Sequence, residues 1–524
     1  MTRHVASVAI AVASLVCSAH AQERVDEAVI AKIKTEGFQH SQVMDTLSWL
    51  TDVHGPRLTG SPELKAAAEW ARDRLTTWGL AKAALEPWGT FGPGWSVERY
   101  SVEMTAPHYT RLIAYPHAWT TSTPGVVKGS PIYVEIASKD DFDKYRGKLK
   151  GAIVLNGKPR KPVSRFEPAA TRLDDRQLAS DLGKIDPGEP RSYLAGQDEW
   201  DEFTKKPREV MDFLKSEGVA VLIEPSVRDF NSVEVAALGY YLGNTERYFP
   251  AFVISKEQFG RITRLLDRKV PVSLELSLST KFHETSADTQ GFNVVAEIPG
   301  TDPALADQVV MIGAHLDSWH SGTGATDNGA GSASVMEAMR ILKATGVKPR
   351  RTIRMALWSG EEQGYFGSTG YVTNHFGNPE TLELKPEQAK VAGYFNLDNG
   401  SGRIRGVYLQ ANEGVRPIFE AWLKPFAYLG ATTITTQNTG GTDHLLFNAV
   451  GIPGFQFLQD PLDYGSRTHH SNIDVYESVM EEDLQQAAVI MASFVYHTAM
   501  RDEMLPRQEL PKPRAKTAKT TAGK

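Results

Sequence analysis

The sequence predicts an α/β protein with a mixed, mostly parallel sheet covered by helices and a β-rich insertion. From about residue 290, strand-like segments alternate with helical ones, and most of these strands are apolar nearly throughout. The region 118–282 instead carries short runs of Val, Ile and Leu separated by glycine and proline. Continuous apolar strands are typical of parallel sheets buried on both faces. A chain of 524 residues is also long for one core, which favours two or more folded units.

Composition and termini divide the chain further. The expected segments are 1–21 as a signal peptide, 22–117 as the first part of the main domain, 118–282 as the insertion, 283–500 as the main part of that domain, and 501–524 as a disordered basic tail. The net charge of −6 and the absence of a Lys/Arg cluster in the body of the chain argue against a nucleic-acid partner. A membrane- or wall-binding role for the basic tail stays an alternative.

The signal peptide is predicted from the first 21 residues. Arg3 and His4 precede the apolar stretch 5–17, and Ala19 and Ala21 form a small-x-small cleavage pattern. The apolar stretch is too short for a permanent span, so we expect export to the periplasm or beyond, without stable membrane insertion. Cys17, the only cysteine, lies inside this segment, although Leu15-Val16 is a poor context for a lipoprotein. The mature chain then has no thiol, and any metal site must use His, Asp and Glu.

Residues 22–50 are expected to form one or two helices, followed by a helix that the sequence defines well. Ser61 is a capping residue, Pro62 suits the first helical position, and Glu63 favours the positive helix end. Leucines and alanines then recur at helical spacing until Gly79. This pattern predicts a helix with one buried face.

In the insertion, "SPIYVEI", "GAIVLNG", "GVAVLIEPS" and "PVSLELSLS" predict strands, and a helix is expected near 209–216. The polar stretch 158–205 is expected to be a long surface excursion. Because no part of 118–282 gathers His, Asp and Glu into a metal-like cluster, we expect this region to carry no chemistry.

In the second half, "DQVVMIGAHLDS", "RTIRMALWSGEE", "VAGYFNLDNG" and "GIPGFQFLQD" predict four strands, with a helix over "GAGSASVMEAMRILKATG" and another from about 480 to 500. Acidic and imidazole groups stand where three of these strands end. They are His315 and Asp317, the pair Glu361-Glu362, and Asp398. Because open α/β sheets bind ligands beyond the carboxyl ends of their strands, these groups are expected to converge on one crevice.

Asp327 at a helix start and His470 in a loop are further candidates. Each residue alone has an ordinary explanation: Asp327 as a helix cap, Asp398 as part of a turn, and the other groups as solvated surface. Their joint occurrence at the ends and loops of one sheet favours a metal site.

The ordered set resembles the zinc aminopeptidase and glutamate carboxypeptidase family, whose members carry a co-catalytic metal pair. The residues that carry the resemblance are His315-x-Asp317, Asp327, Glu361-Glu362, Asp398, and His470 four residues before Asp474. "HGPRLTGSP" and "GGTDHLLFNAVGIPGF" are also similar to that family. The middle segment resembles a protease-associated domain, inserted as in the plasma glutamate carboxypeptidase (carboxypeptidase Q) branch.

The resemblance implies two zinc ions per chain. Asp327 would bridge them, with His315 and Asp398 on one ion and Glu362 and His470 on the other. Asp317 would accept from the His315 ring, and Asp474 is a candidate for the same role near His470. The family also has a cis peptide after the bridging aspartate, here Asp327–Asn328.

The resulting expectation is an exported exopeptidase acting on short peptides or dipeptides, an aminopeptidase or dipeptidase. A metal-bridging hydroxide would attack the peptide bond, with Glu361 as general base and then acid. Many relatives place an oxyanion-stabilising tyrosine directly before the last histidine ligand; here His469 stands there, and Tyr464 or His469 itself would substitute.

Other readings stay open. A single-zinc glutaminyl cyclase-like transferase and an inactive receptor-like binding module share the scaffold, and cobalt or manganese suits the same ligands. The "HETSA" segment lacks the second histidine of a thermolysin-type motif, and no Gly-x-Ser-x-Gly elbow is present. The oligomeric state is undetermined, and a homodimer is compatible with the sequence.

Overall fold

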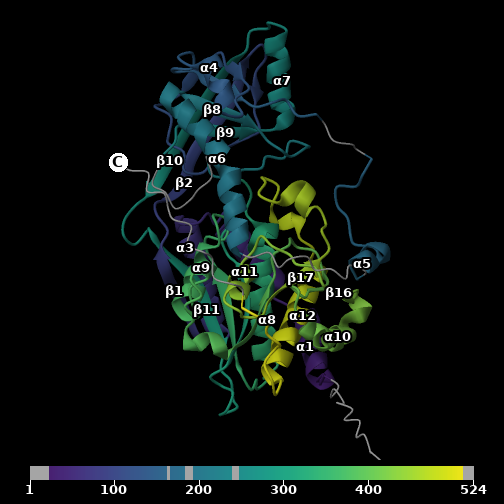
Figure 1. Ribbon diagram of the computed structural model, residues 1–524. Coiled ribbons are helices and arrows are strands. Elements are labelled where there is room, and N and C mark those ends of the chain that lie inside the picture. Colours follow the sequence, from purple (N-terminus) through teal and green to yellow (C-terminus); the bar gives the residue numbers. More distant parts are fainter. Residues whose placement is uncertain (1–22, 162–165, 183–192, 239–246, 511–524) are drawn as a thin grey trace, which may run out of the picture.

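The computed structural model describes residues 23–161, 166–182, 193–238 and 247–510, and for residues 181–182 and 193–202 it describes the backbone elements alone. The signal peptide predicted for 1–21 and the last residues of the tail lie outside this part of the chain. The described residues form a larger and a smaller unit, stacked one above the other (Figure 1). No described helix is both long enough and apolar enough to cross a bilayer.

The larger unit is built on one eight-stranded sheet. In spatial order its strands are β1 (Ala81–Thr90), β11 (Gln290–Ile298), β13 (Thr352–Trp358), β12 (Val309–His315), β14 (Val391–Asn396), β17 (Gly454–Gln459), β15 (Ile404–Tyr408) and β16 (Thr433–Thr435). The four central strands β13, β12, β14 and β17 are parallel, whereas β1, β11 and β15 pair antiparallel with their neighbours. The predicted fold class is confirmed.

Both faces of this sheet are covered, which explains why its central strands are apolar throughout. In β12, Val310 and Ile312 belong to the core on one face, while Met311 between them belongs to the core on the other. The helices on the first face are α1 (Glu27–Gln39), α2 (Val43–Ser48), α3 (Pro62–Thr77), α8 (Ala330–Ala344), α10 (Arg416–Leu423) and α12 (Glu481–Met500). Those on the second are α9 (Phe366–His375) and α11 (His444–Ala449).

Helix α3 follows the sequence prediction closely. The Ser61 side chain accepts from the Leu64 N–H at the predicted cap, and Pro62 occupies the first helical position. The buried residues of the helix are Leu64, Ala67, Ala68, Ala71 and Leu75. Gly79, with a φ of +80°, follows the helix end. Local capping and spacing were therefore sufficient to define this element.

The smaller unit consists of two sheets packed face to face. One contains β3 (Thr110–Arg111), β2 (Gly94–Ala106), β10 (Ser273–His283) and β5 (Val127–Gly129). The other contains β4 (Ala114–Pro116), β9 (Ala251–Ile254), β8 (Val221–Pro225), β7 (Ile153–Asn156) and β6 (Ile132–Val134). Helix α7 (Lys256–Asp267) joins the core between the sheets, and α4 (Phe142–Tyr145) and α6 (Tyr193–Glu217) cover the outer face of the second sheet. Strand β2 lies upstream of residue 118, where the insertion was expected to begin, so the smaller unit starts earlier in the chain than predicted.

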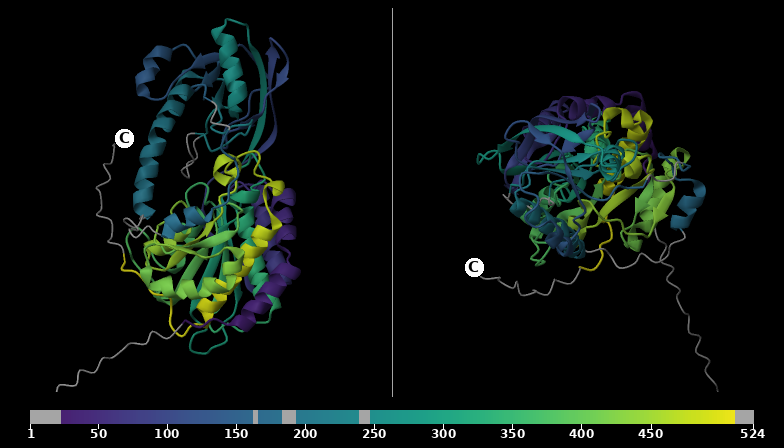
Figure 2. Two further views of the ribbon diagram at one scale, coloured as in Figure 1. Left: turned by 90° about the vertical axis from the view of Figure 1, so that its right-hand side faces the viewer. Right: turned by 90° about the horizontal axis from the view of Figure 1, so that it is seen from above.

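Three expectations for the connecting segments need correction. The helix expected near 209–216 is the C-terminal part of α6, which already begins at Tyr193 and includes Pro207. Within the stretch 158–205, α5 (Asp175–Leu182) lies against β16 of the larger unit, as the views in Figure 2 show. The tail is not disordered from 501: Leu505 is buried, and the Arg507 guanidinium donates to the carbonyl oxygens of Gly451, Gln388 and Val391. These carbonyls lie at chain segments far from the tail, so composition alone could not reveal the contact.

Candidate metal centre

The predicted crevice lies at the carboxyl edge of the parallel strands. Strand β12 ends at His315, β13 ends three residues before Glu361, and β14 ends two residues before Asp398. Because these three strands are parallel neighbours, their polar ends meet at one edge. His470 reaches the same place on the loop that follows β17, the next parallel strand.

Asp327 lies at the centre of the cluster. It sits in the turn Ala325–Gly329 that precedes α8, where its backbone angles are non-helical (φ −131°, ψ 91°), and the peptide bond to Asn328 is cis, as the family resemblance implied. Only glycine fits at position 331, because a Cβ there would lie 2.2 Å from Asn328 Oδ1 and 2.4 Å from the Leu397 carbonyl oxygen. The start of α8 therefore packs tightly against the chain leading to Asp398.

The five predicted ligands come together around Asp327. His315 Nε2 lies 3.3 Å from Asp327 Oδ1 and 3.2 Å from Asp398 Oδ1. On the other side, His470 Nε2 lies 3.2 Å from Asp327 Oδ2 and 2.9 Å from Glu362 Oε2. The ligand atoms of His315, Asp327 and Asp398 are all close enough to share one ion, and so are those of Asp327, His469 and His470.

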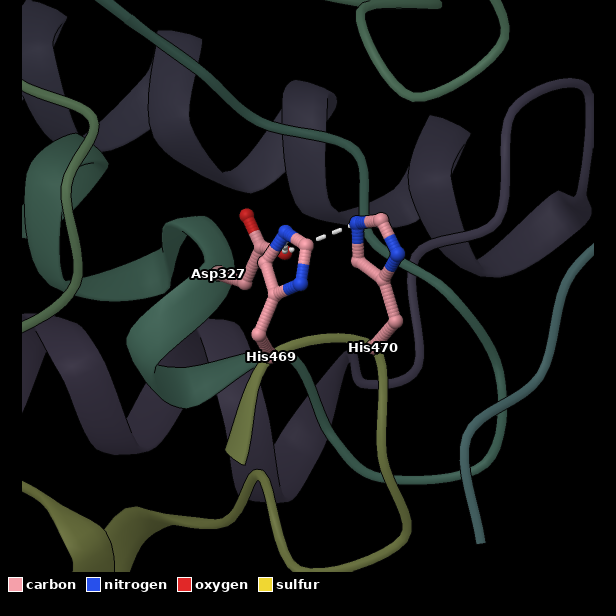
Figure 3. Close-up of side chains that lie close together, drawn as sticks. All are labelled: Asp327, His469 and His470. Atoms are coloured by element: carbon pink, nitrogen blue, oxygen red, sulfur yellow. Dashed lines mark ion pairs between the residues drawn. The ribbon is translucent and has the colours of Figure 1, made fainter. Parts of the chain in front are cut away.

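His469 and His470 lie side by side against Asp327, as the close-up in Figure 3 shows. Their rings are stacked with centroids 3.7 Å apart, and the Tyr464 ring meets the His469 ring edge-on at 4.8 Å. His469 Nε2 is 3.8 Å from Asp327 Oδ2, farther than the corresponding atom of His470. Burial and the carboxylates of Asp327 and Asp398 raise the pKa of Tyr464 well above 10, so the phenol keeps its proton.

Glu361 is buried beside this cluster. Its Oε2 lies 3.9 Å from His315 Nε2, a longer distance than either ligand carboxylate makes to that ring. Burial raises the pKa of Glu361 well above 4.5, and the neighbouring Asp398 and Asp443 act in the same direction. A carboxyl with a raised pKa next to a reaction centre is suited to general acid–base chemistry.

Asp317 and Asp474 make contacts that the sequence did not predict. Nδ1 of the His315 ring is hydrogen-bonded to the Asp317 backbone carbonyl oxygen at 3.0 Å. The Asp317 carboxylate oxygen Oδ1 lies farther from the same nitrogen, at 3.5 Å. The Asp317 carboxylate instead accepts from the backbone N–H groups of Glu361 and Glu362. The Asp474 carboxylate accepts from the N–H groups of Thr326 and Asp327, not from the His470 ring. Both aspartates thus hold the turns that carry the site.

Two further buried side chains, Arg57 and Asp443, support the site. The sequence alone did not predict a role for either. Arg57, fully buried, donates to the carbonyl oxygens of Leu316, Thr323 and Gly324 and so holds the loop between His315 and Asp327. Asp443 accepts from Ser368 Oγ at 2.5 Å, and burial raises its pKa to about 7. Both lie in stretches noted for their resemblance, "HGPRLTGSP" and "GGTDHLLFNAVGIPGF", which is the signal that could have found them.

The donor set fits a pair of divalent cations. Several carboxylates are buried within one small region, and Glu362 Oε1 has no hydrogen-bond donor among the described residues. Buried charges of one sign are costly unless they are paired or bind metal. Imidazole and carboxylate groups in this arrangement suit zinc and other first-row divalent metals.

This excess of negative charge predicts an unusual pH dependence for the metal-free protein. Burial raises the pKa of both Glu362 and Asp474 to about 7, from the ordinary values of 4.5 and 3.8. Between the ordinary and the raised values the folded state binds more protons than the unfolded state. The free energy of unfolding of the protein, after a chelator has removed its metal, should therefore fall as pH rises from about 5 to about 7.5. Urea titrations at both pH values test this, and an unchanged or increased stability at the higher pH would contradict it.

Known proteins are similar to this chain in the region that contains these residues. The family model described as Peptidase family M28 matches residues 293–495, a span that includes all five predicted ligands. The larger unit is similar to that family over this span. This match and the similar proteins indicate that the chain is a metallopeptidase, a hydrolase.

The relatives of this metallopeptidase match it over most of its length. It is 27% identical to human carboxypeptidase Q over 480 residues, which covers 91% of this chain and 89% of the human protein. A peptidase M28 precursor from Shewanella amazonensis superposes with a TM-score of 0.66 at 25% identity, covering 93% of this chain and 99% of that chain. A zinc aminopeptidase from Bacillus subtilis shares the fold with a TM-score of 0.55 at 18% identity, covering 88% and 95%.

Proposed function

We propose that this metallopeptidase is an exported exopeptidase that binds two zinc ions and hydrolyses short peptides or dipeptides. The observation that carries the proposal is the position of Asp327, whose two carboxylate oxygens face different partners. Oδ1 faces His315 and Oδ2 faces His470. One aspartate between two sets of ligands is the arrangement that a shared metal pair requires.

The ligand roles follow from these contacts. His315, Asp398 and one oxygen of Asp327 would hold the first ion, and Glu362, His470 and the other oxygen would hold the second. When bound, the two ions would polarise the scissile carbonyl and make the attacking water more acidic. The zinc aminopeptidase of similar fold supports the choice of metal.

Glu361 would move the proton. Its carboxylate lies beside the ligands and is farther from His315 than the ligand carboxylates are, so it is left to accept a proton from the attacking water. It would then donate that proton to the leaving amine. Asp317 would keep both glutamates in place, since its two carboxylate oxygens accept from their N–H groups at 3.3 and 3.2 Å.

The groups around the metal centre, the smaller unit and the N-terminal segment would each contribute to this function. Tyr464 or His469 would stabilise the developing oxyanion, because both rings lie at the edge of the cluster. The smaller unit, as a protease-associated domain, would form one wall above the strand ends. Residues 1–21 would direct export, to the periplasm or the medium.

A panel of substrates tests the activity. Free dipeptides and aminoacyl anilides should be hydrolysed by the zinc-loaded enzyme, N-blocked peptides should resist, and a chelator should abolish turnover. Cleavage of N-blocked peptides from the C-terminus would instead assign a carboxypeptidase, as the name of the human relative suggests for that protein. Cyclisation of N-terminal glutamine without peptide hydrolysis, or no turnover by the fully loaded protein, would overturn the proposal.

A further inference from the structure

The loop that carries His469 and His470 is held in place by the smaller unit. The Val235 N–H donates to the His470 carbonyl oxygen at 3.0 Å, and the Asn472 N–H donates to the Val233 carbonyl oxygen at 3.1 Å. The Val233 N–H in turn donates to the Asn472 side chain at 2.6 Å. These contacts join segments more than 230 residues apart, so the backbone around His470 depends on the unit for which no chemistry was expected.

Arg228 is the charged member of this contact. Its Nη1 donates to the Gly465 carbonyl oxygen, and its Nη2 lies 3.1 Å from the His469 carbonyl oxygen and 3.3 Å from His469 Nδ1. Its Nε lies 2.6 Å from Glu234 Oε2, and the side chain is only 13% exposed. The guanidinium is therefore fixed on one side by its own unit and on the other by the loop.

This contact determines which nitrogen of His469 carries the proton. A guanidinium has five N–H donors and no acceptor, so Nδ1 of His469 must be the acceptor. A neutral imidazole that accepts at Nδ1 carries its proton at Nε2. That nitrogen is the one that faces the metal centre, 3.8 Å from Asp327 Oδ2. A protonated Nε2 cannot bind a metal ion, but it can donate a hydrogen bond.

We propose that Arg228 is a positioning residue for peptide hydrolysis, which fixes the Nε2–H tautomer of His469 and so makes this histidine a donor to the scissile carbonyl rather than a ligand. The proposal rests on the proposed function. It distinguishes two adjacent histidines that could both reach Asp327: His470 binds metal, and His469 donates. His469 packs between the edge-on Tyr464 ring and the stacked His470 ring, which keeps it in this orientation.

The first test reads the tautomer directly. In zinc-loaded enzyme labelled with ¹⁵N-histidine, long-range ¹H–¹⁵N spectra distinguish protonated from unprotonated ring nitrogens, and the variant His469→Phe assigns the signal. We expect His469 to show a bare Nδ1 and a protonated Nε2. In Arg228→Met the signal should shift toward the other tautomer, whereas Arg228→Lys, which still offers a donor, should retain most of the original state.

The second test separates positioning from general stability. His469→Phe is expected to lower kcat by about 10²–10³-fold, the usual effect of losing one oxyanion donor. Arg228→Met is expected to lower kcat by at least about tenfold, with KM within about threefold and two zinc ions retained. Arg261→Met is the matched control, because it removes an arginine of the same unit that donates to Thr110 rather than to the loop.

Several outcomes would overturn the proposal. They are a protonated Nδ1 of His469 in the wild type, an unchanged tautomer in Arg228→Met, loss of zinc from that variant, or an equal loss of kcat in the control. If Arg228→Met does not fold, the wild-type spectrum and Arg228→Lys still decide. A wild type that holds zinc but cleaves no peptide would contradict the proposed function, while the spectrum would still read the tautomer.

Discussion

Replacing Glu361 with glutamine is expected to lower kcat by about 10²–10⁴-fold, the contribution typical of a general acid–base. The amide keeps the size of the side chain but cannot accept a proton from the attacking water. Because Glu361 lies beside the ligands, 3.9 Å from the His315 ring, the variant should still bind two zinc ions. Turnover of a dipeptide and metal analysis of the same sample measure both properties.

The matched control for Glu361→Gln is Glu420→Gln, on the exposed side of α10 and far from the strand ends. It should change neither turnover nor metal content. Full activity of Glu361→Gln would exclude this residue as the proton carrier. Loss of zinc from that variant would instead make Glu361 a ligand.

Replacing Glu362 with glutamine should have the opposite effect on the metal. Glu362 Oε2 lies 2.9 Å from His470 Nε2, and we assign both side chains to the same ion. Removing one of its carboxylate ligands should weaken binding of that ion by more than about 100-fold, since loss of an outer partner alone costs about 10–100-fold. After dialysis against a zinc buffer, the variant should hold close to one ion per chain.

Adding excess zinc discriminates between the two glutamates. Activity of Glu362→Gln should recover in part as the weakened position fills, because its proton carrier is intact. Activity of Glu361→Gln should not respond. The same response of both variants to zinc would contradict the division of roles between these neighbours.

The sequence predicted which side chains gather at the candidate metal centre because these residues stand at the ends of recognisable strands. His315, Glu362 and Asp398 follow apolar runs, and the parallel order of those strands brings their ends together. Helix α3 was predicted in the same way, from a cap and a spacing confined to a few residues. Where the information was local, the prediction agrees with the structure.

The structure differs from the sequence predictions where a residue contacts a segment that is distant in the chain. Arg57 donates to carbonyls about 260 residues away, and Arg228 contacts a loop 241 residues away. Asp317 was expected to orient the His315 ring, yet its carboxylate accepts from N–H groups of a loop on another strand. Such contacts depend on how strands and units are placed, which no pattern of neighbouring residues records.

A crystal structure of the zinc-loaded protein, with anomalous diffraction recorded on both sides of the zinc edge, would locate the metal ions directly. We expect two zinc peaks bridged by Asp327, one bound by His315 and Asp398 and the other by Glu362 and His470. A single peak, or a second ion bound by His469 in place of His470, would contradict this expectation.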